Sequence, residues 1–464
     1  MTDIDPHVVS WVEITAGGHI KALEQVPAGS RIGYAVDVLT PDGQIRELFL
    51  QRGGRGGAGS FMGFDREAEV YRALEPLGIP IPHVWGVDEV ADVFLVNRAR
   101  GHAWFQPPRG PQQALSIAQE FMRHLATSHK AGARTLDLPS FGPVKSVREH
   151  QSDQLAGIKA AFEAEDSKEP IDALAVVALD YVLHNVPEFD GDPVLVQGDT
   201  GPGNFLYEDS HVTAIIDWEL AHFGDPMDDI AWLSWRATQH GWPDFPARLR
   251  EYESASGIIV DPARVQYYRL NACARLGPRF GLADMGRSTT QPVAGSVNAA
   301  VDRTADGSWL VMNMLHRRMR LTVQATAMGI ELPGREVDVD SEESPYGHLY
   351  DTVLDQLKDI VERVEDPVAS SLAKGAARRV KYIKELDRHG AVFAAHELDD
   401  IGRLLGAVPL SLDDGRARLA AAAREGRVDI EQYLLYHWAR LVRDDLMMRP
   451  ASGAMYDRGW PALT

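Results

Sequence analysis

Three polar side chains stand at a spacing that could perform phosphoryl transfer. Residues 194–218 read VLVQGDTGPGNFLYEDSHVTAIIDW and contain Asp199, Asn204 and Asp217. Such a site needs a carboxylate that orients the attacking hydroxyl, and oxygen ligands that hold Mg²⁺ against the nucleotide phosphates. Asp199 suits the first role and Asn204 with Asp217 the second, because Mg²⁺ prefers hard oxygen ligands. The segment therefore predicts the catalytic centre of a kinase.

The local elements are those that would hold these groups still. Three glycines and a proline within residues 198–203 make this stretch a tight loop. The apolar run at 212–218 predicts a buried strand that delivers Asp217 at its end. Asp and Asn are also ordinary turn and capping residues. Here the spacing, the loop chemistry and the flanking strands occur together, which favours the catalytic interpretation.

Two motifs carry a resemblance to a known family. QGDTGPGNFL followed by IIDWELAHFGDPMDDIAWL is similar to the aminoglycoside phosphotransferase family, whose usual form is HGDxxxxN, then IDWE and GDPxxDLA. The same superfamily includes choline kinase, homoserine kinase and the kinase domains associated with acyl-CoA dehydrogenases. The resemblance implies that Asp199 is the catalytic base, that Asn204 and Asp217 bind magnesium, and that Asp225 and Asp229 support the site.

The resemblance also implies a fold and a reaction. The expected fold class is α+β, a bilobal protein-kinase-like fold with a small β-rich N-lobe and a mostly helical C-lobe, followed by an all-α C-terminal domain. We expect the N-lobe at residues 1–101, the C-lobe with the catalytic loop and acceptor pocket at 102–335, and the helical domain at 345–464. ATP and Mg²⁺ are the implied cofactors, and a hydroxyl of a small molecule is the implied acceptor.

One departure concerns the histidine that usually precedes the catalytic aspartate. Gln197 stands at that position. A glutamine keeps a neutral hydrogen bond but carries no proton at neutral pH, so we infer a structural role for it.

The N-terminal region predicts a small sheet that covers the nucleotide. Strands are expected at 18–27, 34–40 and 45–52. Gly29 and Ser30 lie between the first two, where small residues let backbone amides approach phosphate. On its own a single Gly-Ser turn is more often a plain hairpin, which is the alternative interpretation. The glycine-rich run at 53–59 follows the third strand and is read as a flexible linker.

A helix expected at 64–77 carries the second part of the nucleotide site. In the resembled family this helix holds a Glu that pairs with a basic residue on the third strand and positions the α and β phosphates, and Glu67 stands at the matching place. Gln51 occupies the usual basic position. We therefore expect Arg52 to supply the charge through a shifted register, although both Arg52 and Glu67 could simply be surface charges.

Arginines concentrate where the acceptor pocket is expected, in residues 244–330. The cluster could bind a phosphate, a carboxylate or a CoA-like acceptor, or it could consist of solvated helix-face charges. It comprises Arg269, Arg275, Arg279, Arg287, Arg317, Arg318 and Arg320.

Composition bounds the class of protein. The 464 residues carry a formal net charge of −20, which argues against nucleic acid as a partner. The single cysteine excludes an internal disulfide and fits a cytoplasmic enzyme. Neither a signal peptide nor an apolar stretch near 18 residues is recognisable, so we expect no membrane association.

After residue 345, apolar residues recur at helical spacing, which predicts about five helices. It shows no catalytic motif. Packing against the lobes, forming a wall of the acceptor pocket and assembling a homodimer are all open roles.

The leading hypothesis is thus an ATP- and Mg²⁺-dependent kinase of a small-molecule alcohol. Net acidity favours an amine-bearing acceptor, whereas the arginine cluster favours an anionic alcohol such as a hydroxyacyl-CoA. A nucleotide-binding pseudokinase or scaffold, in which Gln51 and Gln197 mark lost catalysis, is the alternative from another class. Nucleotidyl transfer is a third possibility.

Overall fold

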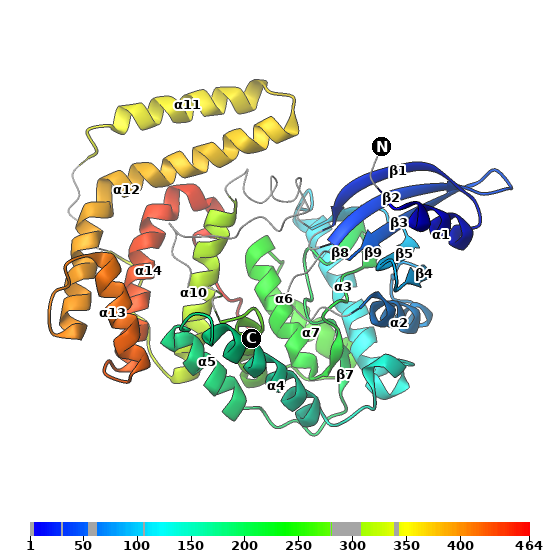
Figure 1. Cartoon of the computed structure of the whole chain (residues 1–464), viewed down its shortest axis with the longest axis horizontal. Coiled ribbons are helices and arrows are strands. Elements are labelled where there is room, and N and C mark those ends of the chain that lie inside the picture. The colour runs from blue at the N-terminus through cyan, green and yellow to red at the C-terminus, as the bar shows by residue number, and fades with distance from the viewer. Residues whose placement is uncertain are drawn as a thin grey trace.

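The computed structural model describes residues 4–28, 31–53, 63–104, 107–278, 280, 308–337 and 343–464. Figure 1 shows a small β-rich lobe at one end, a mostly helical lobe in the middle and a further set of helices at the other end. The expected α+β bilobal arrangement with an added helical region is confirmed. Gly29 and Ser30 lie outside the described residues.

The N-lobe is a five-stranded antiparallel sheet in the order β1-β2-β3-β5-β4. Its strands are β1 (His19–Ala28), β2 (Arg31–Leu39), β3 (Ile45–Arg52), β4 (Val84–Asp88) and β5 (Val93–Asn97). Period-2 alternation divides their side chains between two layers. On β3, for example, Leu48 and Leu50 pack toward α1 (Pro6–Ala16), a helix that the sequence did not lead us to expect, and Phe49 packs toward α2 (Phe64–Leu74).

The C-lobe is built around long helices with two small sheets between them. Its helices are α3 (Pro111–Ala131), α4 (Val147–Asp166), α5 (Ala173–His184), α6 (Pro226–His240), α7 (Phe245–Ser256), α8 (Pro262–Arg275) and α10 (Ser308–Met328). The short strands are β6 (His102–Ala103), β7 (Val194–Val196), β8 (Phe205–Glu208), β9 (His211–Ile215) and β10 (His222–Gly224). Strand β7 pairs with β10, and β8 pairs with β6 and β9.

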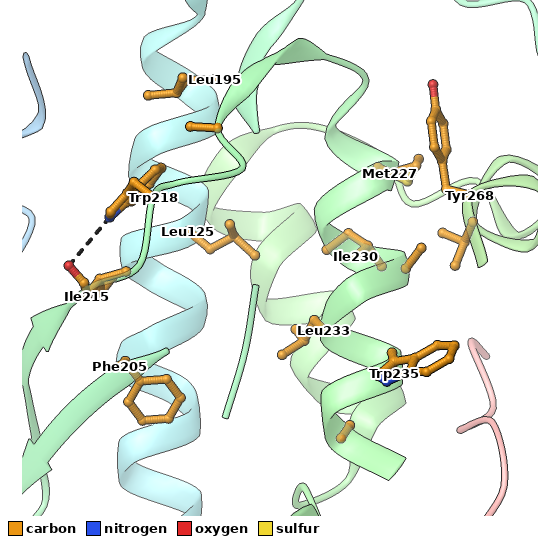
Figure 2. Close-up of a cluster of buried hydrophobic side chains, with 14 of the residues drawn as sticks. Leu125, Leu195, Phe205, Ile215, Trp218, Met227, Ile230, Leu233, Trp235 and Tyr268 are labelled. Carbon is orange, nitrogen blue, oxygen red and sulfur yellow. Dashed lines mark hydrogen bonds between the residues drawn. The ribbon is translucent and has the colours of Figure 1, made fainter. Parts of the chain in front are cut away.

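The C-lobe core fixes the segments that carry the polar motif. Figure 2 shows Leu195 and Phe205, on either side of the catalytic loop, among side chains of α3 and α6. Trp218 is buried in the same cluster, and its Nε1 donates a hydrogen bond to the Ile215 carbonyl at 3.4 Å. Burial of a residue beside Asp217 therefore anchors the Asp217 turn in the apolar interior.

Residues 347–452 are helical apart from short connections. They form α11 (Gly347–Arg363), α12 (Pro367–Leu405), α13 (Leu412–Arg424) and α14 (Ile430–Ser452), which is four α-helices instead of about five because α12 runs for 39 residues. A second hydrophobic core joins α5 and α10 to this region. No helix of the described residues is long and apolar enough to cross a bilayer.

Buried arginines attach α10 to α14. Arg317 Nη1 lies 2.8 Å from Asp444 Oδ2, and Arg318 Nη1 lies 2.9 Å from Asp445 Oδ2. Arg335 contributes a second guanidinium to Asp445. These side chains therefore act neither as acceptor ligands nor as solvated helix-face charges, the two roles considered from the sequence. Of the same arginine cluster, Arg279 and Arg287 fall outside the described residues.

The last residues return to the C-lobe. Trp460 Nε1 donates to the Met319 carbonyl at 2.9 Å, and its ring lies 5.5 Å from that of Trp235 on α6. Arg269 Nη2 donates to the Pro461 carbonyl at 2.9 Å. This C-terminal tail, residues 453–464, thus completes the packing around α6.

Replacing Asp445 with Ala should destabilise the junction between α10 and α14. The substitution leaves the nearly buried Arg318 without its carboxylate, and breaking a buried pair from one side costs about 3–5 kcal/mol. Urea unfolding followed by tryptophan fluorescence measures the loss. Asp414→Ala is the control, because its partner Arg418 is half exposed and such pairs contribute at most about 1 kcal/mol. Equal losses in the two variants would contradict this account.

Candidate active site

The catalytic loop begins where β7 ends and is shaped by glycine. Gly198 has φ +84°, and a Cβ there would lie 2.5 Å from the Leu220 carbonyl oxygen. Only glycine fits such a position without displacement of the backbone. The chain then turns so that Asn204 Nδ2 donates to the Asp199 carbonyl oxygen at 2.7 Å and to Asp199 Oδ2 at 2.8 Å. The two residues predicted from the D-x4-N spacing are therefore in contact.

Asp199 is also held by Arg236, a residue that the sequence analysis missed. Arg236 Nε lies 2.9 Å from Asp199 Oδ1, and its Nη2 bonds to Asp199 Oδ2. Burial opposes the charge of Arg236, but the adjacent Asp199 carboxylate raises the pKa of the guanidinium above its ordinary value. The fork fixes the orientation of Asp199.

Asp217 occupies the left-handed backbone region, with φ +64°. Asp and Asn are the non-glycine residues that tolerate this conformation best. Burial, followed by the negative charges of Glu219, Glu67 and Asp199, raises the pKa of Asp217 to about 8. The side chain therefore lies beside three other acids in a poorly solvated place, which is where a cation would be stabilised.

Glu67 pairs with Arg31, so the expected Arg52–Glu67 pair is wrong. Arg31 Nη1 lies 2.5 Å from Glu67 Oε2, and its Nη2 lies 3.1 Å from Glu219 Oε2. Burial works against the charge, but the two carboxylates raise the pKa of Arg31. The same guanidinium donates to Gln51 Oε1 at 3.2 Å. The charge that Gln51 lacks is thus supplied from the neighbouring strand β2.

Strand alternation explains why Arg52 does not reach Glu67. Gln51 lies on the same side of β3 as Phe49, which packs toward α2, whereas Arg52 follows Leu48 and Leu50 toward the opposite layer. Gly33 is opposite Gln51 in the β2–β3 register, so no side chain lies between Gln51 and Arg31. For Arg52 to face α2, strand β3 would have to shift by one residue relative to its neighbours, and the observed β2–β3 register shows no such shift.

Asp229 holds the backbone of the catalytic loop in place. Its buried carboxylate accepts hydrogen bonds from the Gln197 and Gly198 backbone nitrogens at 2.9 and 3.0 Å, and from the Thr200 hydroxyl. The ring nitrogen Nε2 of the buried His129 lies 3.0 Å from Asp229 Oδ2. Burial alone would raise the pKa of Asp229, but these donors lower it below the ordinary value. The carboxylate therefore stays ionised and holds the loop.

Gln197 has the structural role inferred from its chemistry. Its Nε2 donates to the Ile216 carbonyl at 2.7 Å, next to Asp217. The glutamine thereby ties the start of the catalytic loop to the segment that presents the second acid. This bond needs no titratable group.

The residues present fit a magnesium ion bound together with a nucleotide. Within the described ranges, no group of three or more His, Cys, Asp or Glu could hold a metal unaided. Asn204 uses its amide nitrogen on Asp199, which leaves the amide oxygen as its ligand atom, and Asp217 offers a carboxylate. One or two protein oxygens completed by phosphate and water is the usual set for Mg²⁺.

Comparison with known proteins agrees with this geometry. Residues 25–268 match the phosphotransferase enzyme family. Acyl-CoA dehydrogenase family member 11 of Rattus norvegicus is 26% identical over 181 residues, which cover 37% of this chain and 22% of that protein. Hygromycin-B 4-O-kinase of Escherichia coli is 24% identical over 221 residues, or 45% of this chain and 62% of the kinase. The chain thus spans less than a quarter of the length of the rat protein.

A solved structure shows the same fold. A protein of Ralstonia eutropha, provisionally assigned as an aminoglycoside phosphotransferase, superposes with a TM-score of 0.50 at 18% identity and covers 70% of this chain and 98% of its own. The fold is therefore of the kinase-like kind. The chain belongs to the phosphotransferase enzyme family, which agrees with the expected enzyme class, a phosphotransferase. Residues 269–464 lie outside the match.

Replacing Arg31 with Met should destabilise the protein far more than replacing Arg52 with Met. Arg31→Met leaves the nearly buried Glu67 and Glu219 without a cation, at a cost of about 3 kcal/mol or more. Arg52→Met is the matched control because it removes the same charge from the adjacent strand. Urea unfolding of both variants measures the loss in free energy of unfolding. A larger loss for Arg52→Met would support the Arg52–Glu67 pair expected from the sequence.

Asp217→Asn should stabilise the ligand-free protein in a pH-dependent way. The folded-state pKa of Asp217 is raised from 3.8 to about 8, so its contribution is fully present below pH 4 and is lost as pH rises toward 8. Asn cannot ionise and avoids this loss. The melting temperature of Asp217→Asn minus that of the wild type should grow between pH 5 and 8 and level off above.

Asp209→Asn is the control for the pH series. Asp209 is an exposed aspartate in the same left-handed backbone region, with φ +51°. Its difference from the wild type should stay flat across this pH range. A flat difference for Asp217→Asn as well would show that Asp217 titrates as an ordinary carboxylate.

Proposed function

We propose that this protein transfers the γ-phosphoryl group of ATP to a hydroxyl of a small molecule, with Mg²⁺ as cofactor. The observation that supports the proposal best is the contact of Asn204 with Asp199 beside the buried Asp217. One candidate for orienting a hydroxyl and two candidates for holding a metal meet at one point. Four acids in one poorly solvated place repel one another, and a bound metal ion would offset that repulsion.

In the proposed reaction, Asp199 accepts a hydrogen bond from the acceptor hydroxyl and aligns it with the phosphorus. The two hydrogen bonds from Arg236 fix the position of the Asp199 carboxylate, which favours an orienting role. Asn204 and Asp217 would hold the ion. Bound Mg²⁺ supplies neutralisation of the charge that develops on the phosphate oxygens. Glu67 and Arg31 occupy the positions that fix the remaining phosphates.

The two glutamines no longer favour the pseudokinase alternative. The charge absent at Gln51 is present in Arg31, and Gln197 makes a bond that holds the Asp217 segment. Each of the two glutamines that suggested lost catalysis is thus accounted for by a contact of its own. A scaffold function would need a reason to retain Asp199, Asn204 and Asp217 in contact geometry.

A small cavity of about 210 Å³ lies beside α6. Its lining is Ala237, Thr238, Gly241, Trp242, Phe245, Arg458, Gly459 and Pro461. The one cation of this lining, Arg458, donates from Nη1 to the Gln239 carbonyl at 2.6 Å. None of these residues belongs to the candidate site, so both acceptor classes, an anionic alcohol of the hydroxyacyl-CoA kind and an aminosugar, stay predictions from the sequence.

The relatives are consistent with this range of acceptors. The name of the Escherichia coli protein states that it phosphorylates a hydroxyl of hygromycin B. The rat relative is named for acyl-CoA dehydrogenation. A paired panel of aminosugars and hydroxyacyl-CoA compounds, assayed for ADP release with Mg·ATP, distinguishes the two acceptor classes.

Asp199→Asn should lower kcat by about 10³-fold and leave Mg·ATP binding within a few-fold of the wild type, because only the alignment of the acceptor is lost. Asp217→Asn should instead abolish the magnesium-dependent rise in melting temperature that ATP produces. ADP release and thermal-shift titration are the two measurements.

The control for both variants is Asp209→Asn, which lies in the exposed turn between β8 and β9. Its turnover and nucleotide response should equal those of the wild type. Undiminished turnover in Asp199→Asn would refute the proposed chemistry. Absence of any nucleotide response in the wild type would favour the scaffold alternative.

A further inference from the structure

The helices α11 and α12 form a hairpin at the edge of the molecule. Figure 1 shows α11 lying along the outer side of α12, away from the body of the C-lobe. No side chain of α11 is fully buried, although the helix is strongly amphipathic in sequence. Residues 347–390, which we call the hairpin arm, lie outside the segment that matches the phosphotransferase family.

One side of the hairpin arm and its start is apolar and uncovered by any described residue. Seven large apolar side chains on it are each between 40% and 56% exposed. They are Tyr346, Leu349, Val353 and Ile360 on or just before α11, and Leu372, Ile383 and Leu386 on α12. Together they expose roughly 700 Å², close to the ~800 Å² that each partner buries in a standard protein interface.

The helical repeat gathers these side chains into one stripe on each helix. The four on α11 are separated by 3, 7 and 14 positions from Tyr346, and the three on α12 by 11 and 14 positions from Leu372. Such separations return to the same face of an α-helix. The stripe on α11 is therefore a continuous apolar ridge, whereas on α12 the exposed Arg379 lies on the same face between Leu372 and Ile383.

Charged residues mark the opposite side of the hairpin arm. On α11, Asp351, Asp355 and Glu362 lie about half a turn from the apolar stripe. Lys384 of α12 reaches Asp351 with Nζ 2.6 Å from Oδ1. Because this ion pair joins the charged sides of the two helices, the apolar stripes share the other side.

The hairpin arm is also electrically neutral. Residues 347–390 contain eight Lys and Arg and eight Asp and Glu, in a chain whose formal net charge is −20. Two copies of such an acidic protein repel each other when most surfaces approach. They meet without net repulsion at this arm.

We propose that the apolar side of the hairpin arm is the interface of a homodimer, in which the arms of two copies form a four-helix bundle. A two-fold axis parallel to the helices sets each α11 antiparallel to α12 of the second copy. The contact is isologous, so one patch on one chain satisfies both partners. Helical pairs of this kind pack their apolar ridges at the core of an antiparallel bundle.

Sedimentation velocity and light scattering test the proposal on the purified full-length chain. The wild type should have twice the 51.1 kDa mass of the chain at micromolar concentration. Leu349→Glu combined with Ile383→Glu should raise the dissociation constant of the dimer at least 100-fold, because it places four carboxylates in the bundle core. Leu410→Glu and Val90→Glu, at positions 100% and 96% exposed elsewhere, should leave it unchanged.

Cross-linking tests the same interface without disrupting it. Cys273 is the only cysteine, and it is buried, with its pKa raised to about 12 by burial, so it reacts slowly with maleimides. Val353→Cys should give a covalent dimer with a short bis-maleimide, because Val353 faces the proposed axis. Val90→Cys should not.

Two results would overturn the proposal. One is a monomeric wild type at concentrations up to about 100 µM, since ~700 Å² of apolar surface would then be free or occupied by a different molecule. The other is a dimer that persists in the double glutamate variant and cross-links equally through position 90. Circular dichroism of the double variant verifies that its helices are intact.

Discussion

The site depends on the balance between four acidic side chains and two arginines in a poorly solvated space. Asp199, Glu67 and Glu219 lie close enough to Asp217 for their negative charges to raise its pKa. Arg236 neutralises the first of them, and Arg31 bridges the last two. Burial, followed by the charges of the other three acids, raises the pKa of Asp217 to about 8. A cation bound together with the nucleotide would lower that pKa again.

This balance also explains why both arginines are so firmly placed. Each comes from an element with a large apolar face: Arg31 from the sheet and Arg236 from α6. Arg31 also lies over the ring of Phe64, 4.4 Å from its centroid, which further restricts its position. The apolar cores thus determine where the charges lie, and the charges in turn join the two lobes through Glu67 and Glu219. The first belongs to α2, and the second follows the Asp217 turn.

Much of the fold and part of the site were predictable from sequence. The D-x4-N loop between apolar strands sufficed to bring Asp199 and Asn204 together, because the spacing is short and the loop chemistry is local. Arg31 and Arg236 were missed because their partners are 36 and 37 positions away. Such pairings depend on strand register and helix packing, which a single sequence specifies only weakly. Arg52 was chosen for its position in the strand, but the alternation of β3 directs it to the wrong layer.

The arginines of α10 show a related difficulty. In sequence they look like a basic surface, yet Arg317 and Arg318 are buried against acids more than a hundred residues away. A charge pattern reports the composition of a helix, whereas burial depends on which helix packs against it. The helical character of residues 345–464 was clear from periodicity, but its shared core with α5 and α10 was not.

The return of the C-terminal tail to α6 has a consequence for biosynthesis. Trp460 packs against Trp235, and Thr238 on the same helix donates a hydrogen bond to the Gly459 carbonyl. The helix that carries Arg236 therefore acquires these neighbours only after residues 459 and 460 have been synthesised, 221 positions beyond Thr238 in the case of Gly459. Until then the nascent chain would expose the tryptophan-rich side of α6 to chaperones.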